Sequence, residues 1–274
     1  RLDEFQPTDV DNPLDLSRFL IEGRSEARLP VGLVRGRAFL PRGTVVEGLV
    51  VPVFRAGGYD QLDEPTSPFN LDPPVHSLIP IITREPATTW GNVQGGARVT
   101  TTIGRVDVGA SAYRGFRAFP VPGFELPPAI VKAFPRFTMI GADFETVRGE
   151  WGIRGEAAAF LGDDGFEGGI GADRRAGTYR VAGNVLWTRS QGDDDVSLVA
   201  AVDRSFARET RTLRLFAIYN PADATTFLRV VVTASLRDNV AIEGAGGMFA
   251  GDSAATIGRL ADRDFALLRL KVFF

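Results

Sequence analysis

The last stretch of the chain, Asp264-Phe265-Ala266-Leu267-Leu268-Arg269-Leu270-Lys271-Val272-Phe273-Phe274, decides the fold. Counting back in twos from Phe274 gives only apolar residues as far as Ala266, whereas Arg269 and Lys271 occupy intervening positions. A period of two places alternate side chains on opposite faces of a β-strand. The stretch therefore predicts a strand with one apolar and one charged face, and this strand ends the sequence on an aromatic residue.

The same alternation recurs over most of the sequence. In 150–161, for example, Trp151 and Ile153 share one face, while Arg154 and Glu156 share the other. Many of these segments are as long as the roughly 9 to 11 residues that a strand needs to cross a membrane, against roughly 5 to 6 in soluble proteins. About thirteen strands are predicted, at 31–40, 44–55, 92–103, 105–116, 138–146, 150–161, 166–174, 178–189, 196–207, 211–220, 226–236, 240–249 and 264–274.

The closing strand resembles that of bacterial outer-membrane β-barrels, a family in which a C-terminal Phe and alternating apolar residues carry the recognition signal. The resemblance implies an all-β fold, an antiparallel up-and-down transmembrane β-barrel of about 13–16 strands with long external loops. It also implies the outer membrane of a Gram-negative bacterium as the location. The partners implied are outer-membrane lipids, lipopolysaccharide and the barrel-assembly machinery, which would bind the C-terminal strand.

Loop lengths support this interpretation, because such barrels have short periplasmic turns and longer external connections. If the last strand ends in the periplasm, alternation places tight turns on that side, near 41–43, 104, 147–149, 175–177, 208–210 and 237–239. The external connections are then 56–91, 117–135, 162–165, 190–195, 221–225 and 251–263, and three of these are much longer than the turns.

The odd strand count predicts a further strand upstream of the sequence. Single-chain bacterial barrels have an even number of strands, with both termini in the periplasm. Thirteen strands would leave residues 1–30 outside the cell. We therefore expect 1–30 to be an external loop or segment that follows a missing strand, and 31–274 to be the transmembrane barrel.

The predicted strands divide the charged residues from the aromatic residues. Ionised side chains are expected to line a wet or cross-paired lumen, because isolated charges in a dry interior are too costly. The predicted lumen-lining residues are Arg98, Arg105, Asp107, Asp143, Glu145, Arg154, Glu156, Arg180, Asp203, Arg214, Arg229, Glu243, Arg269 and Lys271, together with Arg35, Arg37, Glu167 and Asp173. Aromatic residues favour the membrane interfaces, and those predicted there are Phe54, Phe116, Trp151, Tyr179, Trp187, Tyr219 and Phe274.

Composition excludes several other classes of function. The formal net charge of −3 argues against a nucleic-acid partner, and the absence of Cys removes disulfides, thiolate catalysis and Cys-ligated metals. No run of 18 apolar residues predicts a transmembrane helix. No cofactor motif is recognised. The chain is therefore not expected to be an enzyme.

Three groups of residues have a chemical alternative. His76, the single His, stands beside Ser77 in a Pro-rich loop, and we interpret it as a loop residue rather than a catalytic base. No metal site is predicted; divalent binding by Asp163, Asp164, Asp193 and Asp194 is an alternative to plain turn chemistry, but no bidentate Glu follows as in an EF-hand loop. Asp143 and Glu145 share a face and are expected to pair with Arg154 or Arg180 rather than to act as acid and base.

The predicted function is porin-like passive transport of small solutes or hydrophobic compounds through a charged lumen. The Pro-rich connections 56–91 and 117–135 are expected to constrict it. The segment Asp11-Asn12-Pro13-Leu14-Asp15-Leu16 also resembles one found in uncharacterised porin-like families that are linked to transport of hydrophobic compounds. Two alternatives stay open: a non-conducting structural or anchoring barrel in an envelope complex, and a soluble secreted β-sandwich binding protein. The solute and the oligomeric state are left open.

Overall fold

The computed structural model describes residues 6–16, 18, 27–59, 79–162, 165–190, 192–208, 210–252, 255 and 257–273. Among the named elements of the described residues, three are short 3-10 helices, η1 (Pro41–Gly43), η2 (Trp90–Asn92) and η3 (Gly258–Leu260), and the others are β-strands. The strands are β1 (Val34–Phe39), β2 (Val45–Val51), β3 (Ile81–Arg84), β4 (Gln94–Ile103), β5 (Val106–Phe116), β6 (Val121–Glu125), β7 (Ala129–Ala133), β8 (Arg136–Arg148), β9 (Trp151–Leu161), β10 (Gly165–Ala176), β11 (Tyr179–Ser190), β12 (Asp193–Phe206), β13 (Arg211–Asn220), β14 (Thr225–Arg237), β15 (Val240–Ala250) and β16 (Phe265–Val272). None of the described helices is long and apolar enough to span a membrane.

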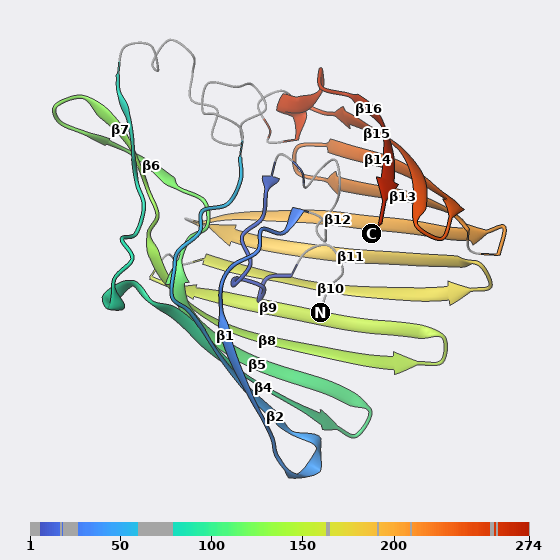
Figure 1. Cartoon of the computed structure of the whole chain (residues 1–274), viewed down its shortest axis with the longest axis horizontal. Helices are drawn as coiled ribbons and strands as arrows, with labels where there is room; N and C mark the ends of the chain where they lie inside the picture. Colours follow the sequence, from blue (N-terminus) through green and yellow to red (C-terminus); the bar gives the residue numbers. More distant parts are fainter. Residues whose placement is uncertain are drawn as a thin grey trace.

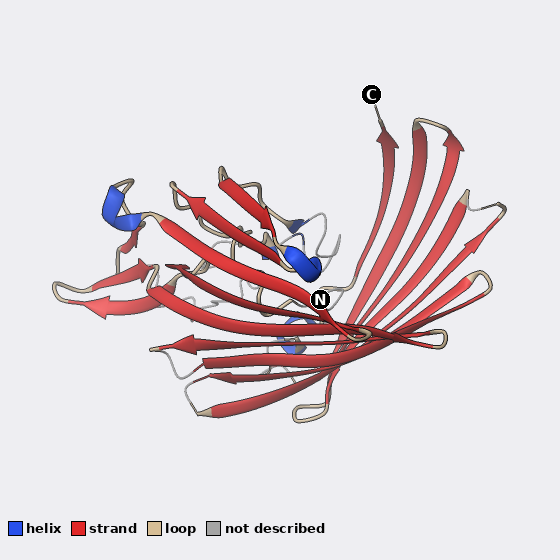
Figure 2. Ribbon diagram, turned by 90° about the horizontal axis from the view of Figure 1, so that it is seen from below, coloured by secondary structure: helices blue, strands red, loops and turns tan. Residues whose placement is uncertain are grey.

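A single 13-stranded antiparallel sheet forms the wall of the molecule, in the order β1-β2-β4-β5-β8-β9-β10-β11-β12-β13-β14-β15-β16. Figures 1 and 2 show these long strands running up and down in a curved, twisted wall. Each strand predicted from the sequence corresponds to one strand of this sheet, so the all-β, up-and-down fold class is confirmed. A β-sandwich would instead pack two such sheets face to face.

The sheet has two edges, because β1 and β16 are each hydrogen-bonded to one neighbour within the described residues. Its shape is therefore that of an open barrel wall. The prediction that another strand precedes residue 1, and that 1–30 is an external segment, stays a prediction.

Connections of different length separate the two ends of the wall. At one end, here called the short-turn end, strands are joined through 40–44, 104–105, 149–150, 177–178, 207–210 and 238–239. At the opposite, long-connection end lie 52–93, 117–135 and 251–264, together with three shorter links. Several boundaries differ from the prediction: β2 ends at Val51 rather than at 55, and β12 begins at Asp193, so the link expected at 190–195 is only 191–192.

A second sheet of three strands, in the order β3-β7-β6, lies within the two longest connections. β6 and β7 form a hairpin, and β3 pairs with β7 in parallel. Figure 1 shows this hairpin extending beyond the ends of the wall strands. The connections 56–91 and 117–135 are therefore folded in part, although residues 60–78 lie outside the described ranges.

The outer face of the wall is apolar along the middle of its strands. Ile140, Ile170, Val185, Leu215 and Leu268 all belong to this face by register, and each is between 39% and 74% exposed. The charged residues that share it are within two residues of a strand end: Arg114, Arg136, Arg148, Arg174, Arg189, Asp194, Arg204 and Arg211. A large exposed apolar surface bounded by charge is what a lipid-facing barrel wall requires.

Candidate functional site

The inner face, which is the concave side of the wall, carries a row of alternating charges across six consecutive strands. Glu145 on β8 lies 3.9 Å from Arg154 on β9, and Arg154 pairs with Asp173 on β10. The row continues through Arg180 on β11, Asp203 on β12 and Arg214 on β13. Nε of Arg180 is 3.2 Å from Asp173, its Nη1 is 4.0 Å from Asp203, and Nε of Arg214 is 3.5 Å from Asp203. We call these six residues the ion-pair ladder. Because its charges alternate, each ionised side chain of the ladder has a neighbour of opposite charge, which lowers the cost of burying it.

The ladder is continued by separate ion pairs toward both edges of the sheet. On β15, Glu243 lies 3.2 Å from Arg269 and 2.9 Å from Lys271, both on β16. On β2, Glu47 contacts Arg37 and lies 3.5 Å from Arg35. Mixed charge thus reaches across most of the wall.

A glycine lets a further ion pair form across an intervening strand. Arg98 on β4 reaches over β5 to Asp143 on β8, with a distance of 2.7 Å between Nη2 and Oδ1. Gly109 lies between them, and a Cβ there would be 2.5 Å from the Asp143 carboxylate and 2.7 Å from Nη2 of Arg98. Any side chain at this position would therefore push the pair apart. The sequence predicted that Asp143 and Glu145 pair with Arg154 or Arg180. In the structure Asp143 pairs with Arg98 instead, whereas Glu145 does lie near Arg154.

The register places the other predicted lumen residues on the inner face, with one exception. Arg105 belongs to the short turn between β4 and β5 rather than to a strand. Asp107 accepts a hydrogen bond from Thr102, and Arg229 is almost fully buried, with its guanidinium 5.1 Å from the Phe216 ring centre. Solvent exposure therefore varies strongly among these residues, which a two-residue period alone does not predict.

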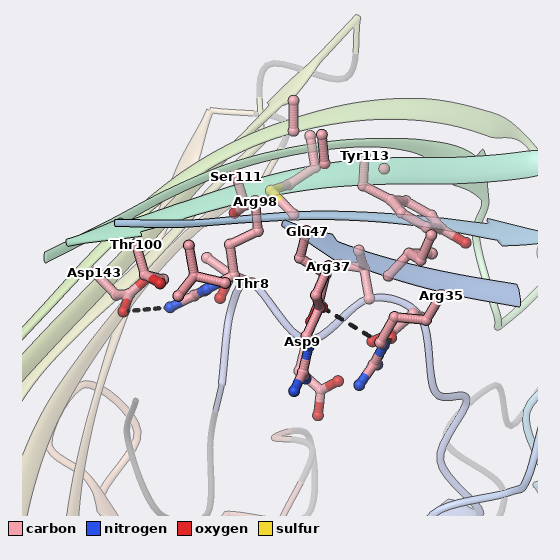
Figure 3. A pocket seen from close by; sticks show the side chains of 18 of the residues that line it. Thr8, Asp9, Arg35, Arg37, Glu47, Arg98, Thr100, Ser111, Tyr113 and Asp143 are labelled. Atoms are coloured by element: carbon pink, nitrogen blue, oxygen red, sulfur yellow. Dashed lines mark hydrogen bonds and ion pairs between the residues drawn. The ribbon is translucent and has the colours of Figure 1, made fainter. Parts of the chain in front are cut away.

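The N-terminal segment 6–16 lies against the inner face. Together with β1, β2, β4, β5 and β8 it encloses a cavity of about 690 Å³. Figure 3 shows Arg35, Arg37, Glu47 and Arg98 projecting from the wall strands toward this segment. Besides these residues, the cavity lining holds further carboxylates and apolar groups, so its chemistry is mixed.

Asp11 of this segment is placed beside the wall. Its carboxylate lies 3.6 Å from Nη2 of Arg35. Burial raises the pKa of Asp11, and the hydrogen bond and negative charge of Asp9 raise it further, whereas Arg35 opposes the shift. The charge of the Asp11 carboxyl group therefore depends on whether segment 6–16 lies against the wall.

Thr8 anchors the segment to the middle of the wall. Both its backbone N–H, at 2.7 Å, and its hydroxyl donate to Oε1 of Glu156, and both residues are buried. Gly141 makes room for the contact, since a Cβ there would be 2.5 Å from the Thr8 methyl group. Nothing in the sequence around Thr8 indicated a partner 148 residues away.

We expect Thr8→Val to loosen this segment. The substitution keeps the shape but removes the hydroxyl, and a hydrogen bond to a charged group contributes about 1.5–3 kcal/mol. Limited proteolysis of the folded protein should cut the segment faster in Thr8→Val than in wild type. Thr8→Ser, which retains the hydroxyl, should behave much more like wild type; equal cleavage of all three would contradict the anchoring role.

A buried apolar cluster fills the inner face toward β16. It consists of Ala182, Leu186, Val199, Ala201, Phe216, Ile218, Phe227 and Phe249, and Ile257, Leu260 and Phe265 pack against it. Ile257 and Leu260 belong to the connection between β15 and β16, which includes η3. Residues of the same face as the ladder are thus covered by the chain itself, in the half of the wall nearer the long connections. The sequence analysis did not predict this cluster.

Five of the predicted interface aromatics lie near strand ends. Trp151, Tyr179, Trp187 and Tyr219 belong to the outer face and are 41% to 44% exposed. Phe116 is on the same face, whereas Phe54 follows β2 and packs against Phe116 and Phe134. Phe274 lies outside the described residues, as does His76.

Among the residues that the structure describes, no three or more His, Cys, Asp or Glu side chains form a cluster that could hold a metal ion. Asp194 accepts a hydrogen bond from the Trp187 indole at 2.9 Å and lies 3.9 Å from Arg189. Asp193 is the first residue of β12, and Asp163 and Asp164 lie outside the described residues.

Neither a protein-family model nor a curated protein matches the sequence. Among solved structures, the anion-selective porin from Comamonas acidovorans is similar at 14% identity, with a TM-score of 0.40 over 65% of this chain; the match spans 55% of that porin, little more than half its length. A mutant of the Rh. blastica porin is similar at 12% identity, with a TM-score of 0.44 over 88% of this chain and 86% of that porin. The chain is similar in structure to bacterial porins.

Proposed function

We propose that the chain is an outer-membrane β-barrel channel for passive movement of small polar solutes, with its short turns in the periplasm. The observation that carries the proposal is the difference between the two faces of one sheet. The outer face exposes apolar side chains at mid-strand and holds charge only near strand ends, whereas the inner face holds the ion-pair ladder. Lipid outside and water inside satisfy both faces at once.

Insertion also requires hydrogen-bond partners for the outer edges of β1 and β16. An unpaired backbone group in lipid costs several kcal/mol, so a stable inserted form has both edges paired. The proposal therefore includes closure of the wall in the membrane.

The direct test is conductance in planar lipid bilayers. The purified, detergent-solubilised chain should produce discrete channel events, and vesicles that contain it should swell in an iso-osmotic sugar solution. Extraction from membranes should require detergent. A folded, inserted protein that yields neither channel events nor swelling would contradict the channel.

The ladder allows a sharper prediction for ion selectivity. Asp173 lies between Arg154 and Arg180, so Asp173→Asn removes the negative charge that both guanidinium groups share. The lumen then gains one net positive charge, and we expect the ratio of chloride to potassium permeability to increase. Reversal potentials in a KCl gradient measure this ratio.

A matched control for the ladder is Glu150→Gln. Glu150 stands in a short turn and pairs with the exposed Arg174 of the outer face. Its substitution by Gln also removes one negative charge. Selectivity should change much less in this variant. A similar shift in both variants would mean that ladder position does not matter.

A second candidate function, a non-conducting structural barrel, is favoured by one specific observation. The apolar cluster, against which Ile257 and Leu260 pack, and the segment anchored by Thr8 both lie on the inner face. We propose that the connection between β15 and β16 and the segment 6–16 constrict the path through the barrel, in addition to the connections 56–91 and 117–135. The same bilayer recordings separate the two functions, because a structural barrel inserts without conducting.

Solutes and partners follow from the chemistry of the wall. The mixed charges that line the cavity favour hydrated polar solutes, whereas hydrophobic compounds would need a path along the apolar cluster. Outer-membrane lipids, lipopolysaccharide and the barrel-assembly machinery are proposed as partners of the outer face and the closing strand. An oligomer or envelope complex is an additional arrangement that chemical cross-linking would detect.

A further inference from the structure

Arginine occurs in or close beside every turn at the short-turn end. The turns and adjoining strand ends, 40–44, 104–105, 148–150, 174–178, 204–211 and 237–239, hold three acidic residues, Glu150, Glu209 and Asp238. The basic residues of the same segments, here called the arginine rim, are Arg42, Arg105, Arg148, Arg174, Arg175, Arg204, Arg208, Arg211 and Arg237. This end of the molecule is therefore strongly positive although the whole chain has a net charge of −3.

Turn geometry does not account for two of these arginines. Arg42 and Arg208 have φ values of 64° and 56°, in the left-handed region where Gly and Asn are favoured. Other short turns place glycine at such a position, as Gly104 and Gly149 do with φ values of 65° and 61°. An arginine in this conformation is locally unfavourable, so its side chain is explained better by what it binds than by the turn.

Four arginines of the rim, Arg148, Arg174, Arg204 and Arg211, also belong to the outer face. Arg174 lies opposite Trp151 in the register, with its guanidinium 5.8 Å from the ring centre, and Arg204 lies opposite Tyr179 at 4.9 Å. Exposed aromatic residues at strand ends favour the headgroup level of a bilayer. Cation–π contacts to these rings therefore hold the guanidinium groups at the height of lipid phosphates.

Few of these charges are neutralised by the residues that the structure describes. Among the described residues, Arg174 of the rim forms an ion pair with Glu150. Guanidinium groups bind phosphate through paired N–H donors, and a basic residue near an anionic membrane surface contributes about 1 kcal/mol, or roughly fivefold in affinity. The chemistry fits a ring of phosphate-bearing headgroups.

We propose that the arginine rim binds the phosphates of anionic phospholipids in the leaflet at the short-turn end. This interaction rests on the proposed membrane insertion and adds lipid selectivity at one side of the barrel. It requires no contact with the lumen. Channel activity and lipid selectivity can therefore be measured separately.

The test reconstitutes the full chain in nanodiscs that mix phosphatidylglycerol with phosphatidylcholine. Native mass spectrometry then gives the ratio of the two lipids that remain bound. The test variant is R174Q/R204Q/R211Q, all from the rim. Its matched control is R114Q/R136Q/R189Q, with the same charge change on the same face at the long-connection end.

Wild type should retain phosphatidylglycerol in preference to phosphatidylcholine, and added salt should reduce the preference. The rim variant should lose about fivefold of it for each arginine removed, while the control keeps most of it. R174K/R204K/R211K retains the charge and should keep most of the preference, which also shows that substitution at these positions permits folding. The proposal is overturned if the rim glutamine variant equals wild type, if the control loses as much, or if the lysine variant loses as much as the glutamine variant.

Conductance in pure phosphatidylcholine bilayers distinguishes the two proposals. A chain that inserts and conducts there but shows no preference for phosphatidylglycerol overturns the lipid site and leaves the channel standing. A chain that does not insert overturns the proposed function, and the lipid site with it.

Discussion

Val185→Arg should destabilise the membrane-inserted protein by about 2–4 kcal/mol, the cost of an arginine at the bilayer midplane on a barrel's lipid face. Val185 lies near the middle of β11 on the outer face, between Ile170 and Leu198, and is 45% exposed. Reversible unfolding by denaturant in lipid vesicles measures the loss.

The same strand supplies the control for this prediction. Val181 has the same face, the same residue type and an exposure of 48%, but it stands two residues from the start of β11. Val181→Arg should cost only about 0–1 kcal/mol, because its guanidinium can reach the headgroups. In a water-soluble protein both substitutions would be nearly neutral, so equal effects would contradict a lipid-facing wall.

Phe227→Ala should have an effect of similar or larger size, but on the interior. Phe227 has no exposed surface; its ring stacks on Phe249, 4.7 Å between centroids, and meets Phe216 edge to face at 6.3 Å. Truncation of a buried Phe costs about 3–5 kcal/mol in unfolding free energy. The cavity left behind also weakens the packing of the connection that carries Leu260, so single-channel conductance should increase.

Leu228→Ala provides the comparison for conductance. It removes apolar atoms from the next residue of β14, but on the outer face. Conductance should not change in this variant. An unchanged conductance in Phe227→Ala would show that the apolar cluster does not restrict the path.

The strand pattern was predictable because polar and apolar residues alternate most cleanly where the two solvents differ most. In β11, for instance, Arg180 and Val181 belong to opposite faces, and the register confirms that division. The start of β12 was predicted wrongly, since consecutive aspartates usually indicate a turn. Here Asp194 and Asp195 are held by Trp187 and Asn220 of neighbouring strands, which are tertiary contacts that no local pattern reports.

The interior of the barrel was much less predictable from the sequence. Phe216 and Phe227 share the inner face with charged residues, but a two-residue period does not say which face of a largely apolar strand points inward. The anchoring of Thr8 by Glu156 depends on chain segments that meet only after the sheet has curved. Both features arise from long-range packing rather than from local propensity.

The ion-pair ladder also has a consequence for how the wall is assembled. Arg180 and Asp203 face each other directly across β11 and β12, as do Asp203 and Arg214 across β12 and β13. A slip of one residue between β11 and β12 would move Asp203 to the opposite face of the wall from Arg180, into contact with lipid. A misaligned strand would therefore be disfavoured in the inserted protein, and the ladder helps to fix the register of the strands that it joins.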